Sequence, residues 1–166
     1  MGLILVLGGT RSGKSDVAER LAGLDRPVTY LATGVLSPDD AEFAQRVARH
    51  RDARPDLWKT VEVAPDDDLV TLVATIDGAL LLDSLGTWLA VQPDFSAEGD
   101  ELAGALADRS EPTVVVSDEV GLGVHPSSAE GRQFRDALGS LNRAVATRAD
   151  RVLLIVAGRA LELGEL

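Results

Sequence analysis

Residues 3–15 of the chain read Leu-Ile-Leu-Val-Leu-Gly-Gly-Thr-Arg-Ser-Gly-Lys-Ser. The unbroken apolar run at the start predicts a short strand buried on both faces. The residues after it fit the phosphate-binding pattern G-x-x-x-x-G-K-[ST] at every fixed position, and a helical pattern continues from Lys14. Strand, glycine-rich turn and helix in this order make a P-loop. The stretch therefore predicts an α/β fold that binds a nucleoside triphosphate, the alternative being glycines that serve only the turn.

Each part of this motif has a chemical role. Glycines let the backbone wrap a phosphate group with its N–H donors. Lys14 can reach the terminal phosphates, and the hydroxyl of Ser15 can ligate Mg²⁺. The predicted nucleotide-binding residues here are Gly8, Gly9, Thr10, Arg11, Ser12, Gly13, Lys14 and Ser15.

Length and composition narrow the class of protein. With 166 residues, the chain is expected to form one domain over residues 1–166. Its apolar runs are too short for a membrane span, and the N-terminus lacks the pattern of a signal peptide. The absence of cysteine fits a cytoplasmic protein. A net charge of −11 argues against a broad surface for nucleic acid or anionic membrane.

Apolar runs alternate with helical patterns along the chain, which predicts a mainly parallel sheet flanked by helices. Ligands of such sheets gather beyond the carboxyl ends of the strands. Gly23 is placed to end the first helix and Ser96 to cap the fourth. The expected strands are Leu3–Leu7, Val28–Leu31, Ala79–Leu82, Thr113–Ser117 and Arg151–Val156, and the expected helices are Lys14–Ala22, Asp39–Arg54, Asp67–Ile76, Ala97–Ala107 and Ser128–Ala149.

A basic segment at residues 46–54 stands out in this acidic chain. It reads Arg-Val-Ala-Arg-His-Arg-Asp-Ala-Arg. A continuous helix would place Arg46, His50 and Arg54 on one face. Arginine suits phosphate oxygens, and a histidine among cations is kept neutral and can act as a base or nucleophile. From the residues alone, a solvated helix end is an equally good interpretation.

Acidic residues follow two of the predicted strands. Asp83 ends one strand segment, and Asp118 with Glu119 follows another. Either place could supply the acid that meets Mg²⁺, and the sequence leaves the choice open. Thr33 and Gly34 could contact a ribose or phosphate or form an ordinary turn. Other residues have simpler interpretations: Gly121–Gly123 form a flexible loop beside the substrate, His125 is structural, Trp58 and Trp88 pack in the core, and Glu62 alone reads as a surface residue.

Taken together, these blocks resemble one family over nearly the whole chain. The chain is similar to the bifunctional adenosylcobinamide kinase / adenosylcobinamide-phosphate guanylyltransferases of cobalamin biosynthesis. The most specific matches are the block around His50 and the stretch Glu119–Pro126. The full set of matching blocks is residues 8–15, 30–33, 46–55, 58–62, 81–85 and 119–126, with Phe134, Arg135, Asp136, Gly139 and Asn142.

The resemblance implies a RecA-like P-loop fold, a homotrimer and two reactions. ATP or GTP phosphorylates the aminopropanol hydroxyl of adenosylcobinamide, and GMP from GTP is then transferred to adenosylcobinamide phosphate. The histidine that carries GMP covalently in the family matches His50, and Lys14 shares the catalytic site. Mg²⁺ would lie near Ser15 and Asp83. Positions that contact the nucleotide match Thr33, Gly34, Val35, Arg51, Asp52, Ala53, Arg54, Glu62 and Asp83.

Two positions depart from the family pattern, because Val91 and Asp118 stand where relatives commonly have asparagine. These departures affect the expected contacts with the corrinoid acceptor more than the expected contacts with GTP. Two alternatives therefore stay open: a different small-molecule P-loop kinase, and a guanylyltransferase that has lost kinase activity.

Overall fold

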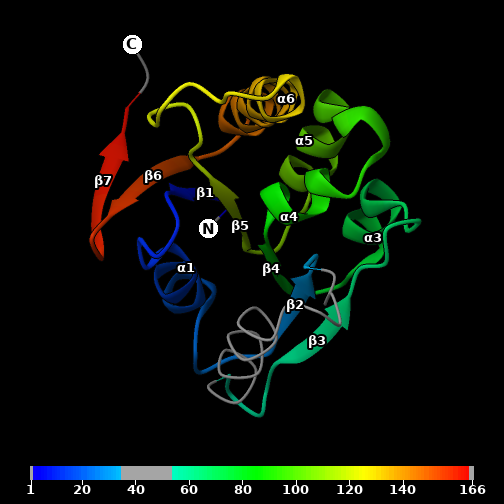
Figure 1. The fold of residues 1–166 in the computed structure, drawn as a ribbon. Coiled ribbons are helices and arrows are strands. Elements are labelled where there is room, and N and C mark those ends of the chain that lie inside the picture. The colour runs from blue at the N-terminus through cyan, green and yellow to red at the C-terminus, as the bar shows by residue number, and fades with distance from the viewer. Residues whose placement is uncertain (1, 35–53, 165–166) are drawn as a thin grey trace.

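The computed structural model describes residues 2–34 and 54–164. Their strands form one sheet in the order β3-β2-β4-β5-β1-β6-β7 (Figure 1). Across the sheet in this order, each pair of neighbours from β3 as far as β6 is parallel, and the last pair, β6 with β7, is antiparallel. The strands are β1 (Leu3–Gly8), β2 (Val28–Ala32), β3 (Lys59–Glu62), β4 (Ala79–Asp83), β5 (Thr113–Asp118), β6 (Arg151–Val156) and β7 (Arg159–Leu163).

Helices cover both faces of this sheet. In Figure 1, α1 (Lys14–Ala22) lies on one side, and the other helices among the described residues lie on the opposite side. These are α3 (Leu69–Thr75), α4 (Leu85–Ala90), α5 (Gly99–Ala107) and α6 (Ala129–Ala146), with the short 3₁₀ helix η1 (Pro93–Phe95) between α4 and α5.

The two helical layers explain the unbroken apolar runs of the strands. Alternate residues of a strand point to opposite faces. Leu3, Leu5 and Leu7 of β1 belong to the core shared with α3 to α6, whereas Ile4 and Val6 belong to the core shared with α1. Because each side of the sheet has its own core, no position in β1 calls for a polar residue.

Several sequence-based expectations are confirmed, among them all five strands, within one residue at their ends. Helix α1 has the predicted bounds, and Gly23 ends it with φ of 102°. Trp58 and Trp88 are both buried core residues. The mainly parallel sheet with helices on both faces confirms the predicted α/β fold.

Other expectations need correction. Ser96 does not cap α5; it ends η1 instead, and the N-cap of α5 is Glu98, which makes no side-chain cap bond. Strands β3 and β7 and helix α4 were not predicted, because they are short and the two strands are largely polar or exposed. The helix predicted over Asp39–Arg54 lies outside the described residues except at its last position.

The fold gathers the candidate residues at one edge of the sheet. Strands β1, β2, β3, β4 and β5 run in the same direction, so their carboxyl ends lie together. Strand β5 lies between β1, which leads into the P-loop, and β4, which ends at Asp83. Within residues 2–34 and 54–164, no helix is long and apolar enough to cross a membrane.

Candidate active site at the P-loop

The P-loop connects β1 to α1 and depends on two of its glycines. Gly13 is the N-cap of α1 and has φ of 87°, a left-handed conformation that costs glycine little. Gly8 has no room for a side chain, since a Cβ there would lie 2.5 Å from Ser12 Oγ and 2.9 Å from the Ile155 carbonyl oxygen. The loop is therefore folded tightly over the end of β1, with the start of α1 at its far side.

The turn between β6 and β7 supports this loop from the side. The Gly158 amide donates to the Ser12 carbonyl at 2.8 Å, and a Cβ on Gly13 would lie 3.4 Å from Gly158 Cα. Ala157 and Gly158 both have positive φ, 49° and 74°, as a tight hairpin turn requires. The sequence does not predict this support, because alanine is a weak signal for such a turn.

Lys14 is held by a carboxylate from the neighbouring strand. Its Nζ lies 2.8 Å from Asp118 Oδ1, and it also donates to the Gly9 carbonyl at 3.4 Å. The side chains of Lys14 and Asp118 are 13% and 28% exposed, so solvent screens the pair only in part. Asp118, one of the two candidate acids, is thus a direct partner of the P-loop lysine.

The position of Asp118 is fixed by residues from three other elements. It pairs in register with Gly8 on β1, and its carbonyl accepts a hydrogen bond from Asn142 Nδ2 of α6 at 3.0 Å. Gly86 of α4 leaves space for the carboxylate, because a Cβ there would lie 2.3 Å from Asp118 Oδ2. No sequence pattern connects residues 14, 86, 118 and 142, so only the tertiary structure brings them together.

This ion pair gives a prediction for triphosphate binding. We expect Asp118→Asn to tighten the binding of Mg²⁺-free GTP by roughly threefold to tenfold, because Lys14 no longer exchanges a carboxylate for phosphate. Fluorescence titration with GTP in EDTA measures the effect. Glu119→Gln is the matched control, because it removes one negative charge at the adjacent residue. In the wild-type structure the Gly121 amide donates to Glu119 Oε1 at 2.6 Å, and glutamine keeps an oxygen for this bond. Weaker GTP binding by Asp118→Asn would contradict the prediction.

The second candidate acid, Asp83, is held by a different group. Tyr30 donates its hydroxyl to Asp83 Oδ2 at 2.8 Å. The Arg54 guanidinium lies 3.4 Å from the centre of the Tyr30 ring and donates to Thr60 Oγ1 at 3.0 Å. Burial, and next the negative charge of Asp83, raise the pKa of Tyr30 above its ordinary value. The phenol therefore stays protonated and remains a donor to Asp83.

The hydroxyl of Thr33 is used within the protein. It is buried, donates to the Ser84 carbonyl at 2.6 Å and accepts from the Ser84 amide at 2.8 Å. It also shares a hydrogen bond of 2.7 Å with Thr87 Oγ1. These bonds join the end of β2 to the start of α4. The Thr33 amide is used as well, because it donates to the Asp83 carbonyl at 3.2 Å. Of the two uses expected for Thr33, these bonds support the structural one.

The remaining predicted residues divide into those the structure describes and those it does not. Register places Glu62, Ala32 and Asp83 in one row across β3, β2 and β4, so Glu62 is an exposed carboxylate at the same edge. His125 is a structural partner, with its Nδ1 2.8 Å from Arg135 Nη1. Five predicted site residues lie outside the described residues: Val35, His50, Arg51, Asp52 and Ala53.

The chain matches known proteins over nearly its whole length. Residues 4–163 match the family described as cobinamide kinase / cobinamide phosphate guanyltransferase. The chain belongs to this family. It is 36% identical to the bifunctional adenosylcobalamin biosynthesis protein CobU of Escherichia coli K12, over 94% of this chain and 96% of that one. It is 38% identical to the corresponding protein CobP of Pseudomonas aeruginosa, over 93% of this chain and 92% of that one.

Among solved structures, the P4 protein from bacteriophage phi6 in complex with ADP covers 96% of this chain and 54% of its own, with 17% identity and a TM-score of 0.45. That likeness is too slight to inform either fold or function.

The P-loop of this family member fits a nucleotide phosphate. Ser12 Oγ is buried in the loop with no hydrogen-bond partner among the described residues, and a buried hydroxyl of this kind needs one. Gly9 is exposed, and a Cβ there would meet nothing within 4 Å, so a ligand can approach its backbone.

The described residues do not build a metal cage of their own, because no group of three or more His, Cys, Asp or Glu side chains there could hold an ion. Mg²⁺ commonly binds through one or two protein oxygens together with substrate phosphates. The candidate residues here suit that mode of binding.

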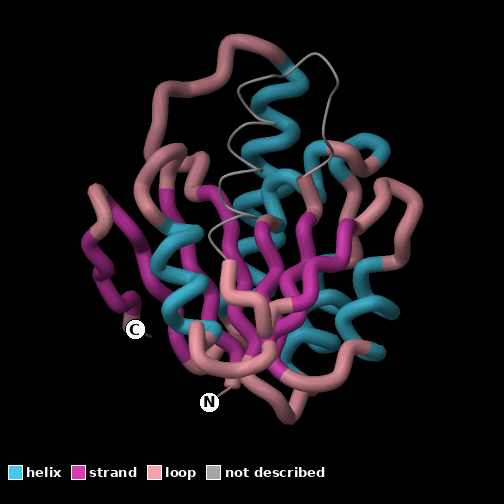
Figure 2. Tube along the Cα trace, turned by 90° about the horizontal axis from the view of Figure 1, so that it is seen from below, coloured by secondary structure: helices cyan, strands magenta, loops and turns pink. Residues whose placement is uncertain are grey.

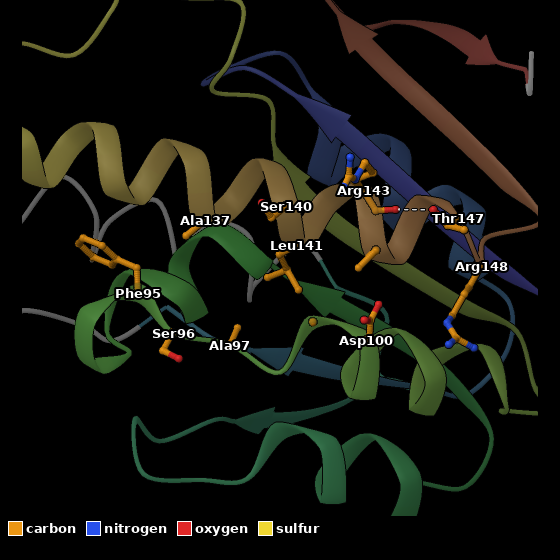
Figure 3. Close-up of a pocket in the computed structure, with 12 residues that line it drawn as sticks. Phe95, Ser96, Ala97, Asp100, Ala137, Ser140, Leu141, Arg143, Thr147 and Arg148 are labelled. Atoms are coloured by element: carbon orange, nitrogen blue, oxygen red, sulfur yellow. Dashed lines mark hydrogen bonds between the residues drawn. The ribbon is translucent and has the colours of Figure 1, made fainter.

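A separate groove lies in the helical layer, away from the residues of the P-loop. It has a volume of about 830 Å³ and lies between α6 and the segment from η1 to α5 (Figure 3). Small residues such as Ala97, Gly99 and Ala144 line it, with Asp100 and Arg148 toward one end. None of the predicted site residues contributes to its wall.

Proposed function

We propose that this chain catalyses two successive transfers at one site. ATP or GTP phosphorylates the aminopropanol hydroxyl of adenosylcobinamide, and GMP from GTP is then transferred to the resulting phosphate to give adenosylcobinamide-GDP and pyrophosphate. The observation that carries the proposal is the position of Arg54. This last arginine of the basic segment stacks on Tyr30, whose hydroxyl holds Asp83 at the edge where the P-loop lies.

In the guanylyl transfer, His50 is the proposed nucleophile. A neutral imidazole nitrogen attacks the α-phosphorus of GTP, a P–N bond forms, and the bond to the β-phosphate oxygen breaks to release pyrophosphate. An oxygen of adenosylcobinamide phosphate then attacks the same phosphorus and frees the histidine. His50 precedes Arg54 by four positions, and four extended residues span at most about 14 Å. This short spacing along the chain supports the proposed role of His50.

In the kinase reaction, Lys14 neutralises charge that develops on the transferred phosphoryl group. Asp118 keeps the Lys14 amine beside the loop until a triphosphate replaces the carboxylate. Mg²⁺, held by Ser15, Asp83 and the phosphates, would supply further neutralisation of charge. Thr33, Gly34, Val35, Glu62 and the residues 51–54 are proposed to contact the nucleotide.

Labelling with GTP tests both halves of this proposal. GTP carrying ³²P at the α-position should leave acid-labile, base-stable label on the protein, and adenosylcobinamide phosphate should remove it as labelled adenosylcobinamide-GDP. GTP or ATP with γ-label should pass its label to adenosylcobinamide. Transfer from the γ-position alone would indicate a simple kinase. Transfer from the α-position alone would indicate a guanylyltransferase without kinase activity.

The hydrogen bond from Tyr30 to Asp83 gives a prediction within this proposal. We expect Tyr30→Phe to raise the Mg²⁺ concentration needed for half-maximal activity roughly tenfold, because a hydrogen bond to a charged group is lost while the ring under Arg54 remains. A Mg²⁺ titration at saturating GTP measures this. Thr60→Val is the control, because it removes the hydrogen-bond acceptor of Arg54 and leaves Asp83 with its Tyr30 bond. An unchanged Mg²⁺ requirement in Tyr30→Phe would argue against Asp83 as the metal acid.

Two further parts of the proposal come from the family resemblance and composition. They are a homotrimer and a cytoplasmic setting without nucleic-acid or membrane partners. Light scattering on the purified protein measures the first.

A further inference from the structure

The loop that connects β5 to α6 carries an unusual pair of side chains. Leu122 is 80% exposed and Val124 is 96% exposed, the highest values among the large apolar residues that the structure describes as exposed. Single exposed apolar residues are ordinary on a protein surface. Two in one loop, next to a candidate active site, point to something that covers them.

This loop is fixed at its beginning. The Glu119 amide donates to the Gly8 carbonyl at 3.1 Å, and Glu119 Oε1 accepts from the Gly121 amide at 2.6 Å. The first of these bonds joins the loop to the residue that opens the P-loop.

The loop is also fixed at its end. Arg132 of α6 donates from Nη1 to the carbonyls of Pro126 and Ser127, each at 3.0 Å. Arg135, one helical turn further along, contacts His125 through Nη1 and Nδ1. Because hydrogen bonds hold both ends of the loop, Leu122 and Val124 lie exposed at its tip.

The tip lies close to the place where phosphate would bind. Leu122 follows Asp118 by four residues, and four extended residues span at most about 14 Å. Asp118 itself lies 2.8 Å from Lys14. In Figure 2 the long loop that leads into the longest helix, α6, stands clear beyond the ends of the strands.

We propose that Leu122 and Val124 form the surface on which the corrin ring of the acceptor docks. This inference rests on the proposed function. Only the aminopropanol arm of cobinamide reacts. The large ring therefore has to lie outside the P-loop while the arm reaches the bound phosphates. The ring carries methyl groups on its faces, and the exposed Leu122 and Val124 beside the P-loop offer apolar contact to them. The same contact serves both reactions, because the ring is common to both acceptors.

The test is a double variant, Leu122→Ser with Val124→Ser, in the full-length protein. We expect the KM for adenosylcobinamide, and its Kd in equilibrium dialysis, to rise on the order of tenfold, since two partly buried apolar contacts are lost. The KM for GTP and the acid-labile GMP label should not change. A small acceptor that has only the arm, an N-acyl 1-aminopropan-2-ol, should react equally slowly with wild type and variant.

The matched control is Leu24→Ser. Leu24 is 50% exposed and follows the end of α1, at the opposite edge of the sheet. It should leave the KM and Kd for adenosylcobinamide unchanged. The single variant Val124→Ser, at the most exposed position, provides the same test if the double variant is poorly folded by circular dichroism.

Each outcome separates this inference from the proposed function. Unchanged binding of adenosylcobinamide by the variants would overturn the docking surface, whatever the wild type catalyses. A smaller assembly in light scattering with unchanged cobinamide binding would show that a second copy covers the loop, which also overturns it. If wild type binds adenosylcobinamide through these residues but transfers no label, the proposed function fails and the docking surface stands.

Discussion

Replacing Lys14 with alanine is expected to lower both transfer reactions about thousandfold. Lys14 stands at the motif position whose cation reaches the terminal phosphates. Its removal also leaves the Asp118 carboxylate, now 2.8 Å from the amine, facing the phosphates without a counter-charge. Both the rate and the affinity for GTP should therefore fall, as measured by γ-label and α-label transfer and by GTP titration.

The chain provides its own control for this substitution. Lys59 is the only other lysine in the sequence. It is exposed at the start of β3, at the end of that strand remote from Glu62. Lys59→Ala should keep both activities within about twofold, as is usual for exposed positions. Lys14→Ala with at least a tenth of wild-type activity would show that residues 8–15 do not hold the reacting phosphates.

Replacing His50 with alanine is expected to abolish the covalent GMP label and the formation of adenosylcobinamide-GDP. Loss of the attacking nitrogen removes the intermediate itself, so the remaining guanylylation should fall below about one thousandth of wild type. Phosphorylation of adenosylcobinamide needs the P-loop but no nucleophile from the protein. It should stay within about threefold of wild type, and so should the Kd for GTP.

Histidine also offers a matched control, because the chain has two histidines. His125 pairs with Arg135 in the loop before α6. His125→Ala should retain the acid-labile label, although it loosens that loop. Label that survives in His50→Ala would exclude His50 as the carrier. Loss of the label in both variants, with GTP binding intact, would point to the fold of the site rather than to the nucleophile.

Much of the fold follows from local signals in the sequence. The P-loop pattern predicts its strand and helix, and Gly23 marks the end of α1 because a positive φ, which glycine adopts readily, is needed there. The central strands are equally readable, since burial on both faces demands unbroken apolar runs. Strands β3 and β7 lie at the two edges of the sheet. Edge strands are exposed and carry mixed residues, so their pattern does not differ from that of a loop.

The candidate site was predictable in its parts rather than in its arrangement. Asp83 and Asp118 are visible as acids after apolar runs, and nothing in their local sequence says which of them contacts Lys14. Strand order decides this, because β5 lies next to β1 and β4 lies one strand further away. Tyr30 was part of a family match without a role, and only the packing of β2 beside β4 brings its hydroxyl to Asp83.

The phosphate-binding loop, the parallel sheet and the family membership follow from local sequence, because they depend on residue types at fixed spacing. Three contacts are visible only once the chain is folded: Asp118 pairs with Lys14, Tyr30 donates to Asp83, and the turn at Gly158 supports the P-loop. Each of these contacts joins residues more than fifty positions apart. Their distances depend on strand order and on the close packing of glycines such as Gly86, which no local pattern encodes.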